Sequence, residues 1–240
     1  MTTVKKLKIA LLTNRNDHLI AEIIPRIKEM SEISFKDIIY CKEKRGGLFV
    51  LMEWVNQVFI KKIRNFLEKI ILYPKVEEDL FTLSSRLGIS AHQLNNIYSQ
   101  KNIDFFRSLN LDLLIVHEIK TLKKPILDIP FLGSIKLHQG EIQKYCGDTP
   151  GFGELWNNEE QIGATVHFIR DMGGACDIVI QKFLPIFEYD NLTSVKAKIS
   201  ELSLEILPEA IKQVACQRKQ RIPQFSKTGN RHPAPTLYRR

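Results

Sequence analysis

The sequence predicts an α/β domain with a mostly parallel sheet flanked by helices, and three observations support this fold class. Short apolar runs are closed by polar residues, most clearly at residues 7–12 and 111–116. Segments with apolar residues at helical spacing lie between these runs. The run at 111–116 is continuously apolar and has helical patterning on both sides, which is typical of a strand in a parallel sheet covered on both faces.

The N-terminal elements follow from their spacing. Residues 7–12 predict a buried strand, and residues 35–40 a second one. Between them a helix is expected, because apolar residues recur every three or four positions. These are Ile20, Ile23, Ile24, Ile27 and Met30. The segment from Lys42 to Gly47 reads as a charged loop.

Residues 48–73 are apolar but interrupted by charges, so they do not form a continuous membrane-spanning run. One apolar stripe at helical spacing predicts a long helix or a broken pair of helices, either packed on its own domain or lying on a membrane surface or a partner. Its apolar positions are Met52, Val55, Phe59, Ile63, Phe66 and Ile70.

The middle of the chain continues the alternation. Residues 77–109 carry helical patterning with a break at Leu87-Gly88-Ile89, and the strand at 111–116 is followed by the polar pair His117 and Glu118. A short connection between Pro125 and Pro130 leads to a strand that begins at residues 134–137. Ligands of open α/β sheets bind at the carboxyl ends of strands, so residues 116–120 and 138–154 are the expected site.

Charge is distributed unevenly along the 240 residues. Lys and Arg number 35 against 27 Asp and Glu, for a net charge of +8. Residues 210–240 hold eight of the basic residues and no acidic ones, which leaves 27 of each sign before them. We therefore expect an α/β domain over residues 1–208 and a basic, partly extended segment over residues 209–240. That segment is either a solvated terminus or a means of attracting anionic substrates.

Cysteine usage and the N-terminus bear on the compartment. The four cysteines stand far apart, with no CxxC pair and no His at ligand spacing, so neither a metal site nor a disulfide framework is expected. The apolar run at residues 9–12 is too short for a signal peptide or a membrane span. These features predict a cytoplasmic protein with reduced thiols.

A series of short motifs accompanies the strand at residue 134. They are Gly133-Ser-Ile-Lys-Leu-His138, Tyr145-Cys146-Gly147, Pro150-Gly-Phe152, Glu154-Leu-Trp-Asn157 and Gly163-Ala-Thr-Val-His-Phe168. The standard nucleotide-phosphate loops and the GxSxG and HExxH motifs are absent from the sequence. The order and spacing of the motifs, over residues 111–181, resemble the folate-dependent formyltransferase family of methionyl-tRNA, glycinamide ribonucleotide and nucleotide-sugar formyltransferases. The resemblance implies a Rossmann-like formyltransferase fold.

The resemblance also implies a reaction in which an amine attacks the formyl carbon of 10-formyltetrahydrofolate. In this family an Asn and a His stabilise the tetrahedral oxyanion and move protons, while an Asp tunes the His. The family His falls on His138, but the Asn position holds Lys136 and the Asp position holds Gly174. Asp171 and Asp177 lie close enough in sequence to be candidate substitutes for the missing carboxylate.

Other site positions depart from the family pattern as well. Gln143 stands at a usual Pro, Cys146 at a usual Arg, Gly153 at a usual Trp and Cys176 at a usual Gly. Three interpretations account for a kept framework with an altered site. The chain is an inactive pseudoenzyme with a binding or assembly role, a formyltransferase that uses a substitute carboxylate, or a different small-molecule protein on the same scaffold.

The remaining polar residues near the strand ends are assigned as follows. His117 and Glu118 are expected to face the same crevice as His138, as cofactor-binding wall residues or toward solvent. His167 alternates with apolar neighbours, which favours a half-buried strand residue over a ligand.

The sequence therefore predicts a formyltransferase-family protein on the small-molecule side, nearest to formylation of an amino sugar nucleotide, with impaired or lost catalysis. The alternative is a catalytically inactive binding or assembly protein. Nucleic acid is not an expected partner, since the methionyl-tRNA branch binds RNA through a further C-terminal domain for which 240 residues leave no room. The sequence does not set an oligomeric state.

Overall fold

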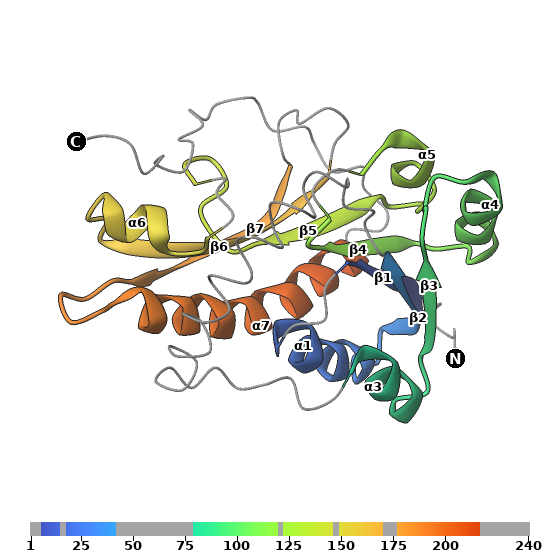
Figure 1. The fold of residues 1–240 in the computed structure, drawn as a ribbon, viewed down its shortest axis with the longest axis horizontal. Coiled ribbons are helices and arrows are strands. Elements are labelled where there is room, and N and C mark those ends of the chain that lie inside the picture. The colour runs from blue at the N-terminus through green and yellow to red at the C-terminus, as the bar shows by residue number, and fades with distance from the viewer. Residues whose placement is uncertain are drawn as a thin grey trace, which may run out of the picture.

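A single seven-stranded sheet organises the protein. The computed structural model describes residues 6–14, 18–41, 79–119, 122–145, 149–169 and 177–216. Its strands run in the order β3-β2-β1-β4-β5-β6-β7 (Figure 1). They are β1 (Leu7–Thr13), β2 (Ile33–Cys41), β3 (Ser90–Leu94), β4 (Leu113–His117), β5 (Ser134–His138), β6 (Gln161–Phe168) and β7 (Ile178–Pro185). The first five are mutually parallel and the last two pair antiparallel, which confirms a mostly parallel sheet.

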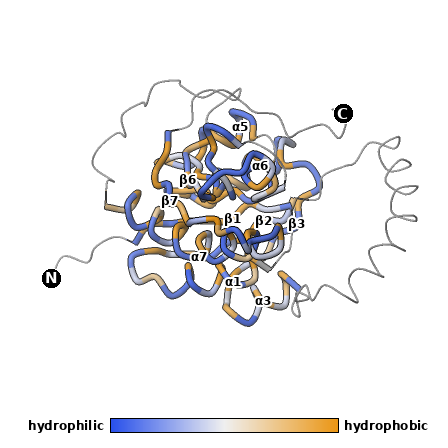
Figure 2. The backbone as a smooth tube through the Cα atoms, turned by 90° about the vertical axis from the view of Figure 1, so that its left-hand side faces the viewer, coloured by the Kyte–Doolittle hydropathy of each residue, from blue (hydrophilic) through white to orange (hydrophobic). Residues whose placement is uncertain are grey.

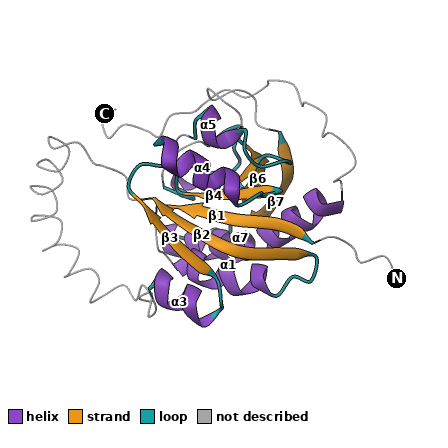
Figure 3. Cartoon of the chain, turned by 90° about the vertical axis from the view of Figure 1, so that its right-hand side faces the viewer, coloured by secondary structure: helices purple, strands orange, loops and turns teal. Residues whose placement is uncertain are grey.

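Helices cover both faces of this sheet (Figure 3). One face carries α1 (His18–Lys28), α3 (Leu80–Arg86) and the long α7 (Leu192–Cys216), and the other carries α4 (Gln100–Ser108) and α5 (Lys124–Leu127). A short helix, α6 (Phe152–Trp156), precedes β6. The predicted α/β class with helical layers is therefore confirmed.

Side chains along β1 point alternately to the two faces of the sheet, and each face has its own hydrophobic core. Ile9 and Leu11 pack with α1 and α7, while Ala10 and Leu12 pack with α4 and α5. All four side chains are buried, so both faces are stabilised by removing apolar surface from water. The mixed orange and blue along α7 in Figure 2 reflects a helix with one buried face.

Most predicted elements are confirmed, and one is wrong. The strands expected at residues 7–12, 35–40, 111–116 and 134–137 and the helix after residue 18 are present. Within the segment predicted to be helical, however, residues 90–94 form β3, which pairs parallel with β2 at the edge of the sheet. Its sequence is polar and half-exposed, so it lacks the apolar signal of a central strand. The expected loop at 42–47 and helix at 48–73 lie outside the described residues.

The C-terminal helix crosses the expected domain boundary. Helix α7 continues through Pro208 to Cys216, so residues 209–216 are helical where a partly extended segment was expected. In the part of the chain that the structure describes, no helix is both long enough and apolar enough to cross a membrane.

Gly151, at the start of α6, provides a stability test. It adopts a φ of +77°, and an added Cβ would overlap the side chain of Val195 in α7. We expect Gly151→Ala to lower the free energy of unfolding by about 3 kcal/mol, through backbone strain and overpacking together. Gly88→Ala is the matched control, because Gly88 has a φ of +63° and an added Cβ there would meet no atom within 4 Å, so that strain alone costs about 1 kcal/mol. Urea denaturation measures both; equal losses would contradict the packing argument.

Candidate functional site

The polar residues of the predicted site meet across β5 and β6. Lys136 pairs with His167, and His138 pairs with Thr165, in the antiparallel register of these two strands. Because alternate residues of a strand share a face, all four lie on one face of the sheet. Val116 of β4 pairs with Lys136 and therefore shares its face of the sheet. Because Val116 packs with α4 and α5, this is the face of the sheet that those two helices cover.

His138 is held by the loop that follows β5. Its Nε2 lies 2.6 Å from the backbone carbonyl oxygen of Tyr145. A carbonyl only accepts, so Nε2 carries the proton and donates. Burial lowers the pKa of His138, a backbone hydrogen bond to Tyr145 opposes the shift, and the nearby Lys136 charge lowers the pKa further. His138 is therefore mainly neutral at pH 7, in the Nε2–H tautomer.

Lys136 does not present its ammonium to His138 as a hydrogen-bond donor. Its Nζ donates to the carbonyl oxygen of Ile119 at 3.0 Å, at the end of β4. The bond anchors the long side chain between the two parallel strands, while its charge still acts on the imidazoles of His138 and His167.

The two residues after Val116 behave differently. Alternation along β4 places His117 on the opposite face of the sheet from Lys136, and its side chain is buried. Glu118 adopts a left-handed backbone with φ of 55°, and its charge raises the pKa of His138. Of the two residues expected to bind the cofactor, Glu118 is therefore the one with an electrostatic effect on His138.

The structure does not join Asp177 to His138. Asp177 is buried just before β7, where its carbonyl accepts a hydrogen bond from the backbone N–H of Phe168 at 2.8 Å. Among the described residues, its carboxylate makes no hydrogen bond to His138. The other positions considered for the carboxylate, Asp171 and Gly174, lie outside the described residues, as do Cys146 and Cys176.

Residues that depart from the family pattern take part in specific contacts of the loop 139–145. Thr165 Oγ1 donates to the Gly140 carbonyl at 2.8 Å and accepts from Gln181 Nε2 at 2.8 Å. The same Gln181 Nε2 donates to Gln143 Oε1 at 3.1 Å, although the family pattern has a Pro at residue 143. The loop is thus tied to β6 and β7.

Gly153 makes room for Tyr145. A Cβ at residue 153 would lie 2.6 Å from Tyr145 Cδ1, so the ring occupies the space of the side chain usual at that position. The Tyr145 hydroxyl donates to Glu159 Oε1 at 2.7 Å and accepts from Asn157 Nδ2 at 3.0 Å. Burial and the Glu159 carboxylate raise the pKa of Tyr145 to about 12, so the phenol stays protonated as a donor.

Two residues that the sequence reasoning did not place in the site are buried beside it. His167 is 6% exposed on the face shared with His138. Glu154 of α6 is 3% exposed, and its Oε1 has no hydrogen-bond partner in the described structure. Burial raises the pKa of Glu154, and the charges of Glu159 and Glu141 raise it further. In the sequence both residues lie within the motifs described above, but the motifs alone did not place either side chain at the site.

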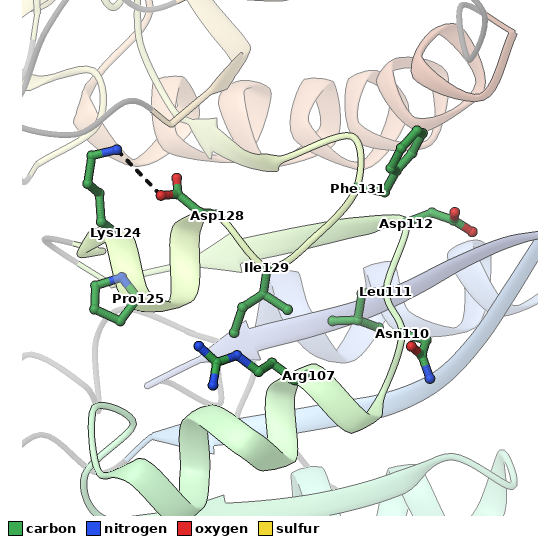
Figure 4. Close-up of a pocket in the computed structure, with 9 residues that line it drawn as sticks. All are labelled: Arg107, Asn110, Leu111, Asp112, Lys124, Pro125, Asp128, Ile129 and Phe131. Carbon is green, nitrogen blue, oxygen red and sulfur yellow. Dashed lines mark hydrogen bonds and ion pairs between the residues drawn. The ribbon is translucent and has the colours of Figure 1, made fainter.

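An open groove lies away from these residues. It has a volume of about 1120 Å³ and lies between α4 and α5 (Figure 4). It is at the amino ends of β4 and β5, whereas His138 is at the carboxyl end of β5. Its charged groups are satisfied locally: Lys124 pairs with Asp128 at 3.4 Å, and Arg107 pairs with Asp104 at 3.0 Å. Of the predicted site residues that the structure describes, none lines it.

The fold and the strand-end imidazole define a class, a Rossmann-like α/β protein with a polar site at the carboxyl edge of its sheet. A family model described as formyl transferase matches residues 75–211, more than half of the chain. The chain therefore belongs to the formyl transferase family.

Known relatives and structures agree with this membership. The chain is 25% identical over 158 residues to a methionyl-tRNA formyltransferase of Staphylococcus epidermidis, covering 65% of this chain and 50% of that protein. It is 28% identical over 123 residues to that of Thermotoga maritima, covering 51% and 39%. The chain thus spans about half the length of the curated relatives it matches, or less.

Solved structures share the fold over greater lengths. Glycinamide ribonucleotide transformylase 1 from Symbiobacterium toebii superposes with a TM-score of 0.61 at 17% identity, covering 94% of this chain and 92% of that one. A sugar N-formyltransferase from a Shewanella species superposes with a TM-score of 0.59 at 14% identity, covering 95% and 76%. At these identities the likeness concerns the fold.

Proposed function

We propose that this protein binds 10-formyltetrahydrofolate and a small-molecule amine at the carboxyl ends of β4 and β5, and transfers the formyl group with impaired catalysis. The observation that carries the proposal is His138, which is retained at the end of β5 with its tautomer fixed by the Tyr145 carbonyl. Formyltransferases of this family generally use that folate, and the imidazole of His138 can donate to a developing oxyanion when its Nε2–H leaves the Tyr145 carbonyl.

The slow rate follows from what surrounds His138. Lys136 stands at the family Asn position but donates to Ile119, and Asp177 makes no hydrogen bond to His138. Removal of a single oxyanion donor typically lowers a rate by about 10² to 10³. The proposed enzyme therefore lacks a group that acts in the transition state while it keeps the shape of the site.

The proposed acceptor is a small-molecule amine, such as an amino sugar nucleotide. Glycinamide ribonucleotide and sugar enzymes share the fold over most of both chains. Glu118 remains the proposed wall of the folate site, with its charge acting on His138, whereas His117 lies on the opposite face of the sheet.

The test of this proposal combines binding with turnover. Purified protein should bind 10-formyltetrahydrofolate and form a formylated amino sugar slowly, in a folate-dependent manner detected by mass spectrometry. His138→Ala should lower the transfer rate by roughly 10² or more, because it removes the imidazole donor. Absence of folate binding by the wild-type protein would refute the proposal, and so would a transfer rate that His138→Ala leaves unchanged.

A second candidate is a catalytically inactive binding or assembly protein. It is favoured by one observation: the donor groups of both Lys136 and His138 already bond to backbone carbonyls of the protein itself. This candidate predicts folate or amine binding with no formylated product at any enzyme concentration, which the same experiment detects.

A further inference from the structure

His167 lies directly beside the two residues at the centre of the site. It pairs across the strands with Lys136, and His138 is two positions along on the same face, opposite Thr165. Direct cross-strand neighbours have Cβ atoms about 5 Å apart, and diagonal ones about 7 Å. The charge of His138 lowers the pKa of His167, in agreement with this proximity.

The hydrogen bond of His167 fixes its tautomer. Nδ1 lies 3.0 Å from the carbonyl oxygen of Phe168, and because a carbonyl only accepts, Nδ1 carries the proton. Nε2 then bears the lone pair, and among the described residues it has no hydrogen-bond partner. His167 therefore brings to the site an acceptor nitrogen that no described residue occupies.

The two histidines present opposite nitrogens. In His138 the nitrogen farther from the backbone, Nε2, is a donor already bonded to the Tyr145 carbonyl. Its acceptor is Nδ1, the ring nitrogen nearer to the backbone. In His167 the nitrogen farther from the backbone is the acceptor. Lys136 only donates. Of these three side chains, His167 is thus the one whose ring tip can take a proton from a bound molecule.

Burial keeps this acceptor nitrogen unprotonated. The His167 side chain is 6% exposed, and burial lowers its pKa to about 4, a shift that the neighbouring His138 and Lys136 charges extend and the Phe168 hydrogen bond opposes. The ring is accordingly neutral at pH 7, with its lone pair intact.

We propose that His167 is a catalytic residue whose Nε2 accepts the proton of the attacking amine, an inference that rests on the proposed function of the site. The amine nitrogen forms a bond to the formyl carbon and gives a proton to Nε2. The tetrahedral intermediate then breaks its bond to the folate nitrogen, which receives that proton. The products are a formamide and tetrahydrofolate, and His167 returns to its neutral form.

The weak basicity of His167 is a further cause of slow transfer. General bases work best with a pKa near the operating pH, and His167 is a much weaker base than that. The site would therefore turn over slowly even when both substrates are well placed, in agreement with impaired catalysis.

Chemical rescue tests the inference. His167→Ala should lower the single-turnover rate of amine formylation by about 10² to 10⁴, with folate affinity close to that of the wild type. Free imidazole should then restore part of the rate by entering the space of the deleted ring, which a purely structural role of His167 does not predict. His92→Ala is the control, since His92 lies in β3 at the far edge of the sheet, and its rate should match the wild type with no response to imidazole.

His167→Asn keeps the experiment decisive if His167→Ala does not fold. The shorter amide can still donate to the Phe168 carbonyl but has no nitrogen at the ring tip, so the rate should fall by a similar factor. A wild-type rate in either folded variant, or a loss that imidazole does not restore in a folded His167→Ala, overturns the inference and leaves the proposed function intact. Folate binding by the wild type without any product also overturns it, whereas absence of folate binding refutes the proposed function itself.

Discussion

Lowering the pH from about 6.5 to about 4 is expected to cost the folded protein about 3 kcal/mol through His167 alone. Its pKa falls from 6.5 to about 4 on folding because the ring is buried, and each pKa unit corresponds to about 1.4 kcal/mol. Between these two pH values His167 is protonated in the unfolded chain but remains neutral in the folded protein. The stability is therefore present above pH 6.5 and is lost as the pH falls toward 4.

Two other buried groups shape the same curve. Burial lowers the pKa of His138, so its contribution is lost on acidification in the same direction. Burial raises the pKa of Glu154, so the contribution of Glu154 is full below the ordinary Glu value and is lost as the pH rises through the raised pKa. On acidification from neutral pH, protonation of Glu154 therefore raises the free energy of unfolding, while protonation of the two histidines lowers it.

Urea denaturation at several pH values between 4 and 7 isolates the His167 effect. His167→Asn should reduce the dependence of unfolding free energy on pH by most of the 3 kcal/mol expected above. Val166→Ala is the matched control, because it should lower stability at every pH by about 2 kcal/mol without adding or removing a titrating group. A wild-type pH dependence in His167→Asn would contradict a buried, neutral His167. Repeating both in a Glu154→Gln background removes the opposing contribution.

The fold was predictable from the sequence where burial leaves a periodic trace. Strands β1 and β4 are buried along nearly their whole length, so they read as apolar runs, and the buried face of α1 repeats every three or four residues. Strand β3 was not predicted, because an edge strand is partly exposed to solvent and its sequence can be polar. Its residues form a strand through hydrogen bonds to β2, a long-range cause that local periodicity does not record.

The candidate site was predictable only in part, for a similar reason. The position of His138 followed from its motif at the end of a strand. The role of His167 depends on the register between β5 and β6 and on which of its nitrogens meets the Phe168 carbonyl. Both are set by tertiary geometry, so an apolar-polar alternation in the sequence predicted only a half-buried strand residue. The departure at Gly153 likewise becomes intelligible once this residue is seen in contact with the Tyr145 ring.

The double variant Lys136→Asn with Gly174→Asp should raise the formyl transfer rate by roughly 10² or more over the wild type. Asn at residue 136 offers a short amide donor in place of a side chain that reaches away to Ile119, and Asp at residue 174 supplies the carboxylate implied by the family pattern. The choice of residue 174 rests on sequence, because it lies outside the described residues. Single-turnover rates of the double variant, each single variant and the double variant with His138→Ala measure the gain and its dependence on His138.

The outcome separates two causes of slow transfer. If the missing groups limit the rate, the double variant gains activity that His138→Ala abolishes. If it still binds folate but is no faster than the wild type, the restored groups are not sufficient. The limit then lies in the weak base His167 or in the loop that holds His138, where the Tyr145 carbonyl accepts the hydrogen bond from Nε2–H and the Gly140 carbonyl accepts one from Thr165 Oγ1. In that case the contacts that order the site also withhold its donor from the substrate.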